Sequence, residues 1–210
     1  MPLYKIDSIG KESAVGIWHI QETEEALAYE AFEQCPEELV SQQKRLEWLA
    51  GRALIRKLVE TYHLPYAGIL KDEFGKPYLR ELSHHISLSH SYPFVAAQID
   101  SNQSVGIDLE QPKKKLLAIA SRVLSPEELE NVGTDIVKHC VYWCAKETMY
   151  KMYGKRGLHF SNQLNIKPFS LTENGSLKGI ITANNQKQAV NLNYRIEKDF
   201  VLVYTQPILK

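Results

Sequence analysis

The hydrophobic pattern of this chain passes from helix-type spacing to strand-type alternation twice, and this repeated order limits the fold more than any single motif does. In the first half, a strand candidate (14–20) and a polar helix candidate (22–33) precede a longer helical segment that begins at Ser41. Apolar residues follow helical spacing along that segment until His63-Leu64-Pro65 ends it. Short strand-like runs then follow as far as Ile99.

The second half shows the same order of patterns without any repeat at the level of individual residues. After the polar segment Asp100–Ser104, helical spacing returns between residues 115 and 153, and strand-like sequence resumes at Leu164. Because each half contains both helices and strands, we expect each to bury its own core. The sequence therefore predicts an α+β fold of two similar α+β lobes, residues 1–103 and residues 104–210.

Composition narrows the class of protein further. The 210 residues are 44% hydrophobic and 24% charged, which is typical of a folded domain. Lys plus Arg and Asp plus Glu both total 25, so a globally basic nucleic-acid binder is excluded. No apolar run approaches the roughly 18 residues of a membrane span, and the opening MPLYKIDSIGKE has charges where a signal peptide needs an apolar region. Three cysteines without a framework indicate reduced thiols, so we expect a cytoplasmic protein.

The segment VGIDLE (105–110) is the first with candidate functional residues. In a strand, residues two apart point to the same face, so Asp108 and Glu110 would aim their carboxylates together. Two such carboxylates repel each other unless a cation lies between them, and oxygen ligands suit Mg²⁺. A strand end whose acids are merely hydrated is the simpler interpretation of this pair alone.

The segment WCAKETMYK (143–151) is the second. On a helix, Trp143, Glu147 and Lys151 share one side, opposite an apolar stripe. Glu147 and Lys151 could be an ordinary surface pair. Taken with Asp108 and Glu110, however, Glu147 is a candidate third metal ligand or a base, and Lys151 a candidate phosphate-binding ammonium.

Two further groups carry weaker signals. The segment ISLSHS (86–91) ends a strand candidate with hydroxyls and an imidazole that could donate to an anion, although a structural histidine is the default interpretation. Lys44, Arg45 and Arg52 lie on the long helix of the first half, and Lys76 lies in a Gly-Lys-Pro turn. Taken alone, such residues usually belong to a solvated helix face or to an ordinary turn between strands.

Taken together, these segments resemble the signature of the 4'-phosphopantetheinyl transferase superfamily. VGIDLE and WCAKETMYK resemble its pair of motifs, G-[IV]-D-x-E and W-[ST]-x-K-E-[SA]-x-x-K. The order of the remaining segments also agrees, and the resemblance covers most of residues 41–170; these segments are FGKPYL, ISLSHS, LAIASRVLSPEE and GKRGLHF. Chain length and the repeated pattern favour the larger, pseudo-dimeric type typified by surfactin-synthetase activators.

The resemblance implies a fold, a reaction and a set of partners. The two lobes would pack as a pseudo-dimer with the active site in the cleft between them, and the protein would be a monomer. It would be a transferase of the holo-[acyl-carrier-protein] synthase kind, moving 4'-phosphopantetheine from coenzyme A to a serine of an apo acyl or peptidyl carrier protein. The other product would be adenosine 3',5'-bisphosphate. Neither a nucleic acid nor a membrane is expected as a partner.

The resemblance also implies a role for each candidate residue. Asp108, Glu110 and Glu147 would hold Mg²⁺, with Mn²⁺ as an alternative metal; Glu147 would also act as the catalytic base, and Lys151 would be catalytic through the pyrophosphate oxygens. The remaining residues would bind coenzyme A, Ser89 and His90 through its 3'-phosphate or adjacent phosphates; they are Lys44, Arg45, Arg52, Lys76, Ser89 and His90.

The chain departs from the signature at two positions. Cys144 stands where Ser or Thr is usual, and Thr148 where Ser or Ala is usual. Both side chains are small and neither position is a ligand, so we expect activity to survive. Thiol catalysis by Cys144 is a poor interpretation, because no motif puts a histidine beside it.

Carrier proteins of this kind are generally acidic, so a neutral enzyme needs a local basic and apolar patch. Lys113, Lys114 and Lys115, followed by Leu116, Leu117 and Arg122, are the best candidates, although a solvated loop explains them about equally well.

Two other functions use the same residues. A Mg²⁺-dependent phosphohydrolase acting on coenzyme A or another nucleotide would need the same acids and lysine. A non-catalytic module that binds coenzyme A or a carrier protein is the second alternative, which the intact metal-ligand pattern disfavours.

Overall fold

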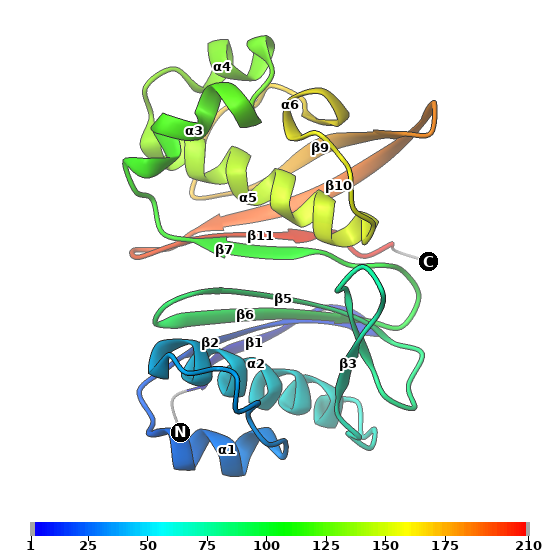
Figure 1. Cartoon of the computed structure of the whole chain (residues 1–210). Helices are drawn as coiled ribbons and strands as arrows, with labels where there is room; N and C mark the ends of the chain where they lie inside the picture. Colours follow the sequence, from blue (N-terminus) through cyan, green and yellow to red (C-terminus); the bar gives the residue numbers. More distant parts are fainter. Residues whose placement is uncertain (1–2, 209–210) are drawn as a thin grey trace. The chain divides into compact units, whose positions relative to one another are not determined.

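The computed structural model describes residues 3–208, which form two units (Figure 1). The first comprises residues 3–105 together with 207–208, and the second comprises Gly106–Gln206. Each unit contains one antiparallel sheet and its own helices, so the predicted α+β class with two lobes is confirmed. The packing of the lobes as a pseudo-dimer around a cleft stays a prediction.

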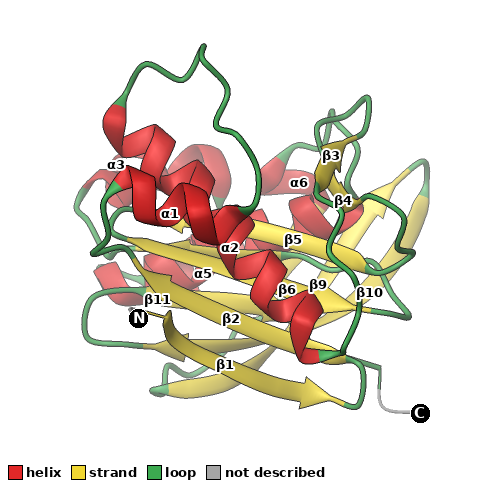
Figure 2. Cartoon of the chain, turned by 90° about the horizontal axis from the view of Figure 1, so that it is seen from below, coloured by secondary structure: helices red, strands yellow, loops and turns green. Residues whose placement is uncertain are grey.

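The first unit has a six-stranded sheet in the order β1-β2-β6-β5-β4-β3. Its elements are β1 (Leu3–Gly10), β2 (Ser13–His19), α1 (Glu24–Ala31), α2 (Gln42–Thr61), β3 (Ile69–Lys71), β4 (Pro77–Leu79), β5 (His85–Ser91) and β6 (Phe94–Asp100). Helix α2 packs on β6, β2 and β5, and Figure 2 shows it crossing these strands. The apolar stripe that predicted this helix supplies its buried face, including Leu49, Leu54 and Leu58.

The second unit has a five-stranded sheet in the order β7-β11-β10-β9-β8. Its elements are β7 (Ile107–Glu110), α3 (Lys115–Val123), α4 (Pro126–Val132), α5 (Ile136–Tyr153), α6 (Phe160–Gln163), β8 (Leu164–Ile166), β9 (Asn174–Ala183), β10 (Gln186–Ile196) and β11 (Val201–Thr205). Helix α5 lies against β11 and β7 (Figure 1). Strand β7 carries the first predicted motif and α5 carries the second, so the fold of this unit brings the two motifs together.

Residues on one side of α5 bind the sheet through its carbonyl groups. The Cys144 thiol lies 3.9 Å from Val201 O, and Thr148 Oγ1 donates to Val203 O at 3.1 Å. Gly106, just before β7, allows the closest approach: a Cβ there would lie 1.9 Å from Thr148 O. Only glycine fits at that position, so the glycine of the VGIDLE motif brings β7 and α5 into contact.

The structure differs from the sequence-based order of elements in one respect. An additional strand, β1, precedes the predicted strand 14–20 (β2) and pairs with it in an antiparallel hairpin that the hydrophobic pattern did not predict. Ser125 caps the N-terminus of α4 and forms a capping box with Glu128. Among residues 3–208, no helix is both long enough and apolar enough to cross a membrane.

Candidate functional site

The end of β7 places Asp108 and Glu110 two residues apart on one strand. Opposite them on β11 are Val203 and Val201, respectively. Asp108 is buried and Glu110 is partly exposed. Because strand side chains alternate between faces, both carboxylates leave the strand on the same face, as the sequence predicted.

Lys151 connects α5 to this strand end. Its Nζ donates to Asp108 Oδ1 at 2.6 Å and to Ile107 O at 3.1 Å. Both side chains of this ion pair are largely shielded from solvent. Glu110 forms a separate ion pair with the exposed Lys115, at 3.0 Å from Nζ to Oε2. The structure therefore brings Lys151 to Asp108, whereas Glu110 has a different basic partner.

Glu147 lies one helical turn before Lys151 on α5. The pKa of its carboxyl group is raised to about 7: burial is the largest cause, the charge of Asp108 acts in the same direction, and Lys151 acts in the opposite direction. Asp108, Glu147 and Lys151 thus influence one another electrostatically. A carboxylate with a pKa near neutrality can accept a proton at physiological pH, which suits a general base.

The donor chemistry of these acids suits a hard divalent cation, since all three offer carboxylate oxygens. A cation would also relieve the repulsion between Asp108 and Glu147 that contributes to the raised pKa of Glu147. Within residues 3–208, however, no three His, Cys, Asp or Glu side chains are gathered closely enough to hold a metal ion. The shared metal site of Asp108, Glu110 and Glu147 therefore stays a prediction.

The neighbour of Glu147 in the sequence, Lys146, was not among the predicted site residues. It is fully buried and pairs with the equally buried Glu128, at 2.6 Å from Nζ to Oε2. Its Nζ also donates to Val123 O at 2.9 Å and to Phe160 O at 2.8 Å. Lys146 therefore fastens α5 to α4 and to the ends of α3 and α6. The sequence signal for this role was the lysine of the W-[ST]-x-K-E-[SA]-x-x-K motif, which comes directly before Glu147.

In the first unit, the predicted residues Lys44 and His90 both contact Glu47, which was not among the predicted site residues. Glu47 on α2 is 3% exposed and accepts from Lys44 Nζ at 2.7 Å, while His90 Nδ1 on β5 lies 3.2 Å from the same Oε2 atom. Gln43 Nε2 donates to Oε1 at 2.9 Å. Burial acts to raise the pKa of Glu47, but these hydrogen bonds and the charge of His90 hold it below its ordinary value. The sequence signal that could have identified Glu47 was the presence of a glutamate within the apolar stripe of α2.

Arg45 and Arg52 contact other residues of the first unit, not Glu47. Arg45 binds Glu24 through its guanidinium and donates to Leu39 O at 3.2 Å. Arg52 stacks over the Trp48 ring at 3.6 Å from the ring centroid. The structure does not bring these two arginines to the Glu47 cluster, and their role toward coenzyme A stays a prediction.

Ser89 and Lys76 complete the predicted set. Ser89 is buried on β5, opposite Ala96 of β6. Lys76 Nζ donates to Ser104 Oγ at 2.5 Å, and burial lowers the pKa of Lys76. Both are held in place within the first unit, which is compatible with the predicted binding role but does not test it.

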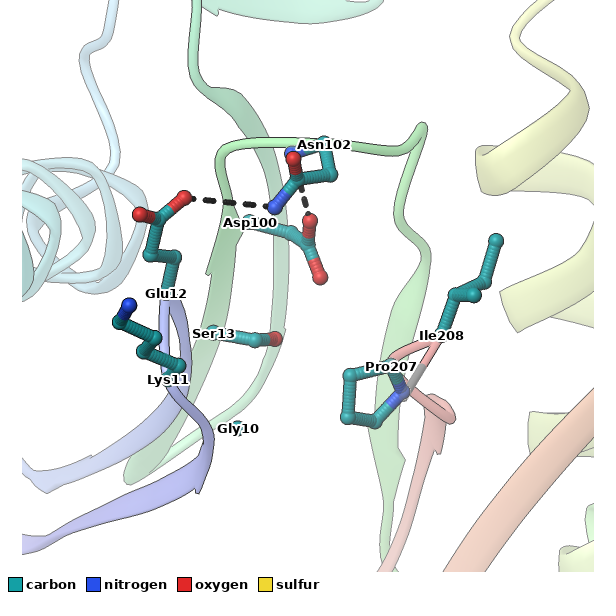
Figure 3. Close-up of a pocket in the computed structure, with 8 residues that line it drawn as sticks. All are labelled: Gly10, Lys11, Glu12, Ser13, Asp100, Asn102, Pro207 and Ile208. Atoms are coloured by element: carbon teal, nitrogen blue, oxygen red, sulfur yellow. Dashed lines mark hydrogen bonds between the residues drawn. The ribbon is translucent and has the colours of Figure 1, made fainter. Parts of the chain in front are cut away.

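A cavity of about 380 Å³ in the first unit lies elsewhere (Figure 3). Its lining is Gly10, Lys11, Glu12, Ser13, Asp100, Asn102, Pro207 and Ile208. Asp100 is buried there and accepts from the backbone N–H groups of Asn102 and Gln103. None of the predicted site residues lines this cavity, and its acids already have donors.

The second unit covers nearly the same residues as the family model that matches this chain. Residues 104–205 match the family model described as the 4'-phosphopantetheinyl transferase superfamily. "4'-phosphopantetheinyl transferase psf-1" of Bacillus pumilus is 36% identical over 116 residues, which cover 51% of this chain and 49% of that protein. "4'-phosphopantetheinyl transferase Sfp" of Bacillus subtilis (strain 168) is 34% identical over 118 residues, 51% of each chain.

The aligned region spans about half the length of these curated relatives. The comparisons confirm the resemblance of the chain to the 4'-phosphopantetheinyl transferase superfamily and to its larger, surfactin-synthetase-activator-like type. The matched residues include Asp108, Glu110, Glu147 and Lys151.

Proposed function

We propose that this protein transfers the 4'-phosphopantetheine group of coenzyme A to a serine hydroxyl of an apo acyl or peptidyl carrier protein. In this reaction a bond forms between the serine oxygen and the β-phosphorus, and the phosphoanhydride bond breaks. Adenosine 3',5'-bisphosphate leaves, and the serine proton passes to a base. The observation that carries the proposal is the Asp108–Lys151 pair beside Glu147, within the segment that matches the superfamily.

Glu147 is the base in this proposal. Its pKa of about 7 leaves a substantial ionised fraction at neutral pH while keeping the carboxylate basic enough to take the serine proton. Lys151 reaches the strand end from α5 and would bind oxygens of the pyrophosphate, whose charge must be offset during attack.

Asp108, Glu110 and Glu147 would hold Mg²⁺, or Mn²⁺ in its place, which would supply further neutralisation of the pyrophosphate charge. In the first unit, Ser89, His90, Lys44 and Lys76 would bind the nucleotide part of coenzyme A, and Arg45 and Arg52 would contribute more remotely. We expect the protein to act as a monomer in the cytoplasm, in a reaction of the holo-[acyl-carrier-protein] synthase kind.

The test is intact-protein mass spectrometry of an apo carrier protein incubated with this protein, coenzyme A and Mg²⁺. We expect the carrier to gain about 340 Da, the mass of the transferred group. Asp108→Ala and Glu147→Ala should reduce the rate at least about 100-fold, since each removes charge or proton transfer from the reacting centre. Glu130→Ala, at an exposed glutamate of the same unit, is the matched control and should retain the rate.

Two outcomes would contradict the proposal. If several apo carriers keep their mass while coenzyme A is consumed, the protein is a phosphohydrolase. If neither the carriers nor coenzyme A change while either still binds, it is a binding module.

A further inference from the structure

Glu47 is the residue in the first unit whose surroundings the proposed function does not explain. It is a carboxylate on α2, 3% exposed, within a face that is otherwise mainly apolar. A buried carboxylate is unfavourable unless donors satisfy it. Glu47 receives three: Gln43 and Lys44 from its own helix, and His90 from β5. The chain thus maintains a buried anion whose partners include two residues of the predicted coenzyme A site.

The geometry assigns each partner an orientation. Lys44 Nζ and His90 Nδ1 approach the same oxygen, Oε2, at 2.7 Å and 3.2 Å. Because Nδ1 faces Glu47, a protonated imidazole would donate to a ligand through its other N–H group, at Nε2. Lysine has a flexible four-carbon stem, and an ion pair at its end limits where the ammonium can lie. The side chains of Lys44 and His90 are about half exposed, whereas the carboxylate that joins them is buried.

We propose that Glu47 is a positioning residue that holds Lys44 and His90 together as paired donors for the 3'-phosphate of coenzyme A. This inference rests on the proposed function, because it concerns recognition of the same substrate. A phosphate monoester has several acceptor oxygens and close to two negative charges near neutral pH, so two adjacent cationic donors suit it. Glu47 lies behind them and does not itself contact the substrate.

The removal of Glu47 has two opposing electrostatic consequences. Loss of its negative charge would strengthen the attraction of any anion to this surface. Loss of its carboxylate would also free the Lys44 stem and take away the acceptor that orients the His90 imidazole. The first effect acts on every phosphate, whereas the second acts on the phosphate that these two side chains contact. The ratio of the affinity for a nucleotide with a 3'-phosphate to the affinity for a nucleotide without one therefore separates the two effects.

The experiment compares binding of adenosine 3',5'-bisphosphate and adenosine 5'-monophosphate by calorimetry. The wild-type protein should prefer the bisphosphate, and Glu47→Gln should reduce that preference about tenfold, equivalent to about one charge-assisted hydrogen bond. Glu60→Gln is the matched control: it also lies on α2 and pairs with Arg56, at 2.7 Å, away from the cluster. It should leave the preference unchanged.

An unchanged or increased preference in folded Glu47→Gln would overturn the inference. If that variant fails to fold, a double-mutant cycle of Lys44→Ala and His90→Ala decides the matter at exposed positions. Because one carboxylate holds both side chains, the double variant should lose less binding free energy for the bisphosphate than the two single variants lose in sum. Additive losses would overturn the inference.

The failure of this inference is distinguishable from the failure of the proposed function. Binding of the two nucleotides requires neither a carrier protein nor turnover. A protein that modifies the carrier but binds both nucleotides equally keeps the proposed function and contradicts the role of Glu47. A protein that prefers the bisphosphate but never modifies a carrier contradicts the proposed function alone.

Discussion

At the scale of residues, Lys146 and Glu147 show how neighbours in the sequence take opposite roles. Lys146 is fully buried and paired with Glu128, which also accepts the backbone N–H of Ile166 at 2.7 Å. Glu147, one position on, faces Asp108 and Lys151 instead. A step of about 100° around a helix separates the two side chains. The buried pair therefore holds α5 at the position from which Glu147 reaches the candidate site.

The raised pKa of Glu147 predicts a pH-dependent stability. The folded-state pKa of about 7 exceeds the ordinary value of 4.5, so the protonated form favours folding and the ionised form opposes it. In metal-free protein, the contribution of Glu147 is fully present below pH 4.5 and is lost as the pH rises through about 7. We expect a loss of about 2–3 kcal/mol in the free energy of unfolding, from about 1.4 kcal/mol per pKa unit.

Urea unfolding at pH 4.5 and pH 8 in a chelating buffer measures this loss. Glu147→Gln cannot ionise, so its free energy of unfolding should change less between these two pH values. If wild-type protein and Glu147→Gln show the same pH dependence, the carboxyl group of Glu147 titrates normally and the electrostatic description of the site is wrong.

At the scale of elements, the contact of β7 with α5 determines the geometry of the candidate site. Asp108 and Glu110 come from the strand, and Glu147 and Lys151 from the helix. The two elements approach closely because Gly106 has no side chain. A change at Gly106 therefore alters the site without changing any residue that would touch a substrate.

We predict that Gly106→Ala lowers stability by about 3 kcal/mol or more, because its Cβ would lie 1.9 Å from Thr148 O and 2.9 Å from Met152 N. Backbone atoms of a helix cannot move aside as the end of a side chain can. The midpoint of urea unfolding measures the effect, and the mass-shift assay should show reduced transfer.

Gly51→Ala is the control for this substitution. Gly51 lies inside α2, and the nearest atom to a Cβ there is 3.6 Å away, an ordinary contact. Alanine should raise stability by about 1 kcal/mol through its higher helix propensity. Equal effects of the two substitutions would show that the contact between β7 and α5 is not tight.

At the scale of the whole molecule, a net charge of zero means that the proposed recognition of an acidic carrier protein depends on local surfaces. Lys113, Lys114 and Lys115 are exposed at the start of α3, and Leu117 on the same helix is 40% exposed. Lys115 differs from the other two because it pairs with Glu110. Of the other residues predicted for the docking patch, Arg122 is exposed, whereas Leu116 is only 3% exposed and packs in the core of the second unit.

We predict that reversing the charge of Lys113 and Lys114 to glutamate raises KM for the carrier about tenfold and leaves KM for coenzyme A unchanged. Lys115 is kept, so that the ion pair with Glu110 is undisturbed. Lys187→Glu, at an exposed lysine of β10, is the control for net charge. An equal rise in both KM values would contradict a docking role for the two lysines.

The sequence by itself determined the α+β class, the two-lobed order and the segments with candidate functional residues. These properties follow from local patterns, because the apolar spacing and the two signature motifs each lie within short stretches of chain. The family resemblance was available for the same reason. The boundaries of most predicted helices and strands agree closely with the structure, although β1 has no comparable pattern.

Only the tertiary structure decided which side chains meet. Glu47 joins Lys44 to His90 across α2 and β5, and Glu128 joins Lys146 from another helix. Nothing in the local pattern distinguishes a buried glutamate with partners from a solvated one, because burial depends on elements distant in the sequence. The same holds for the pKa of Glu147, which depends on desolvation and on Asp108 across the contact between β7 and α5.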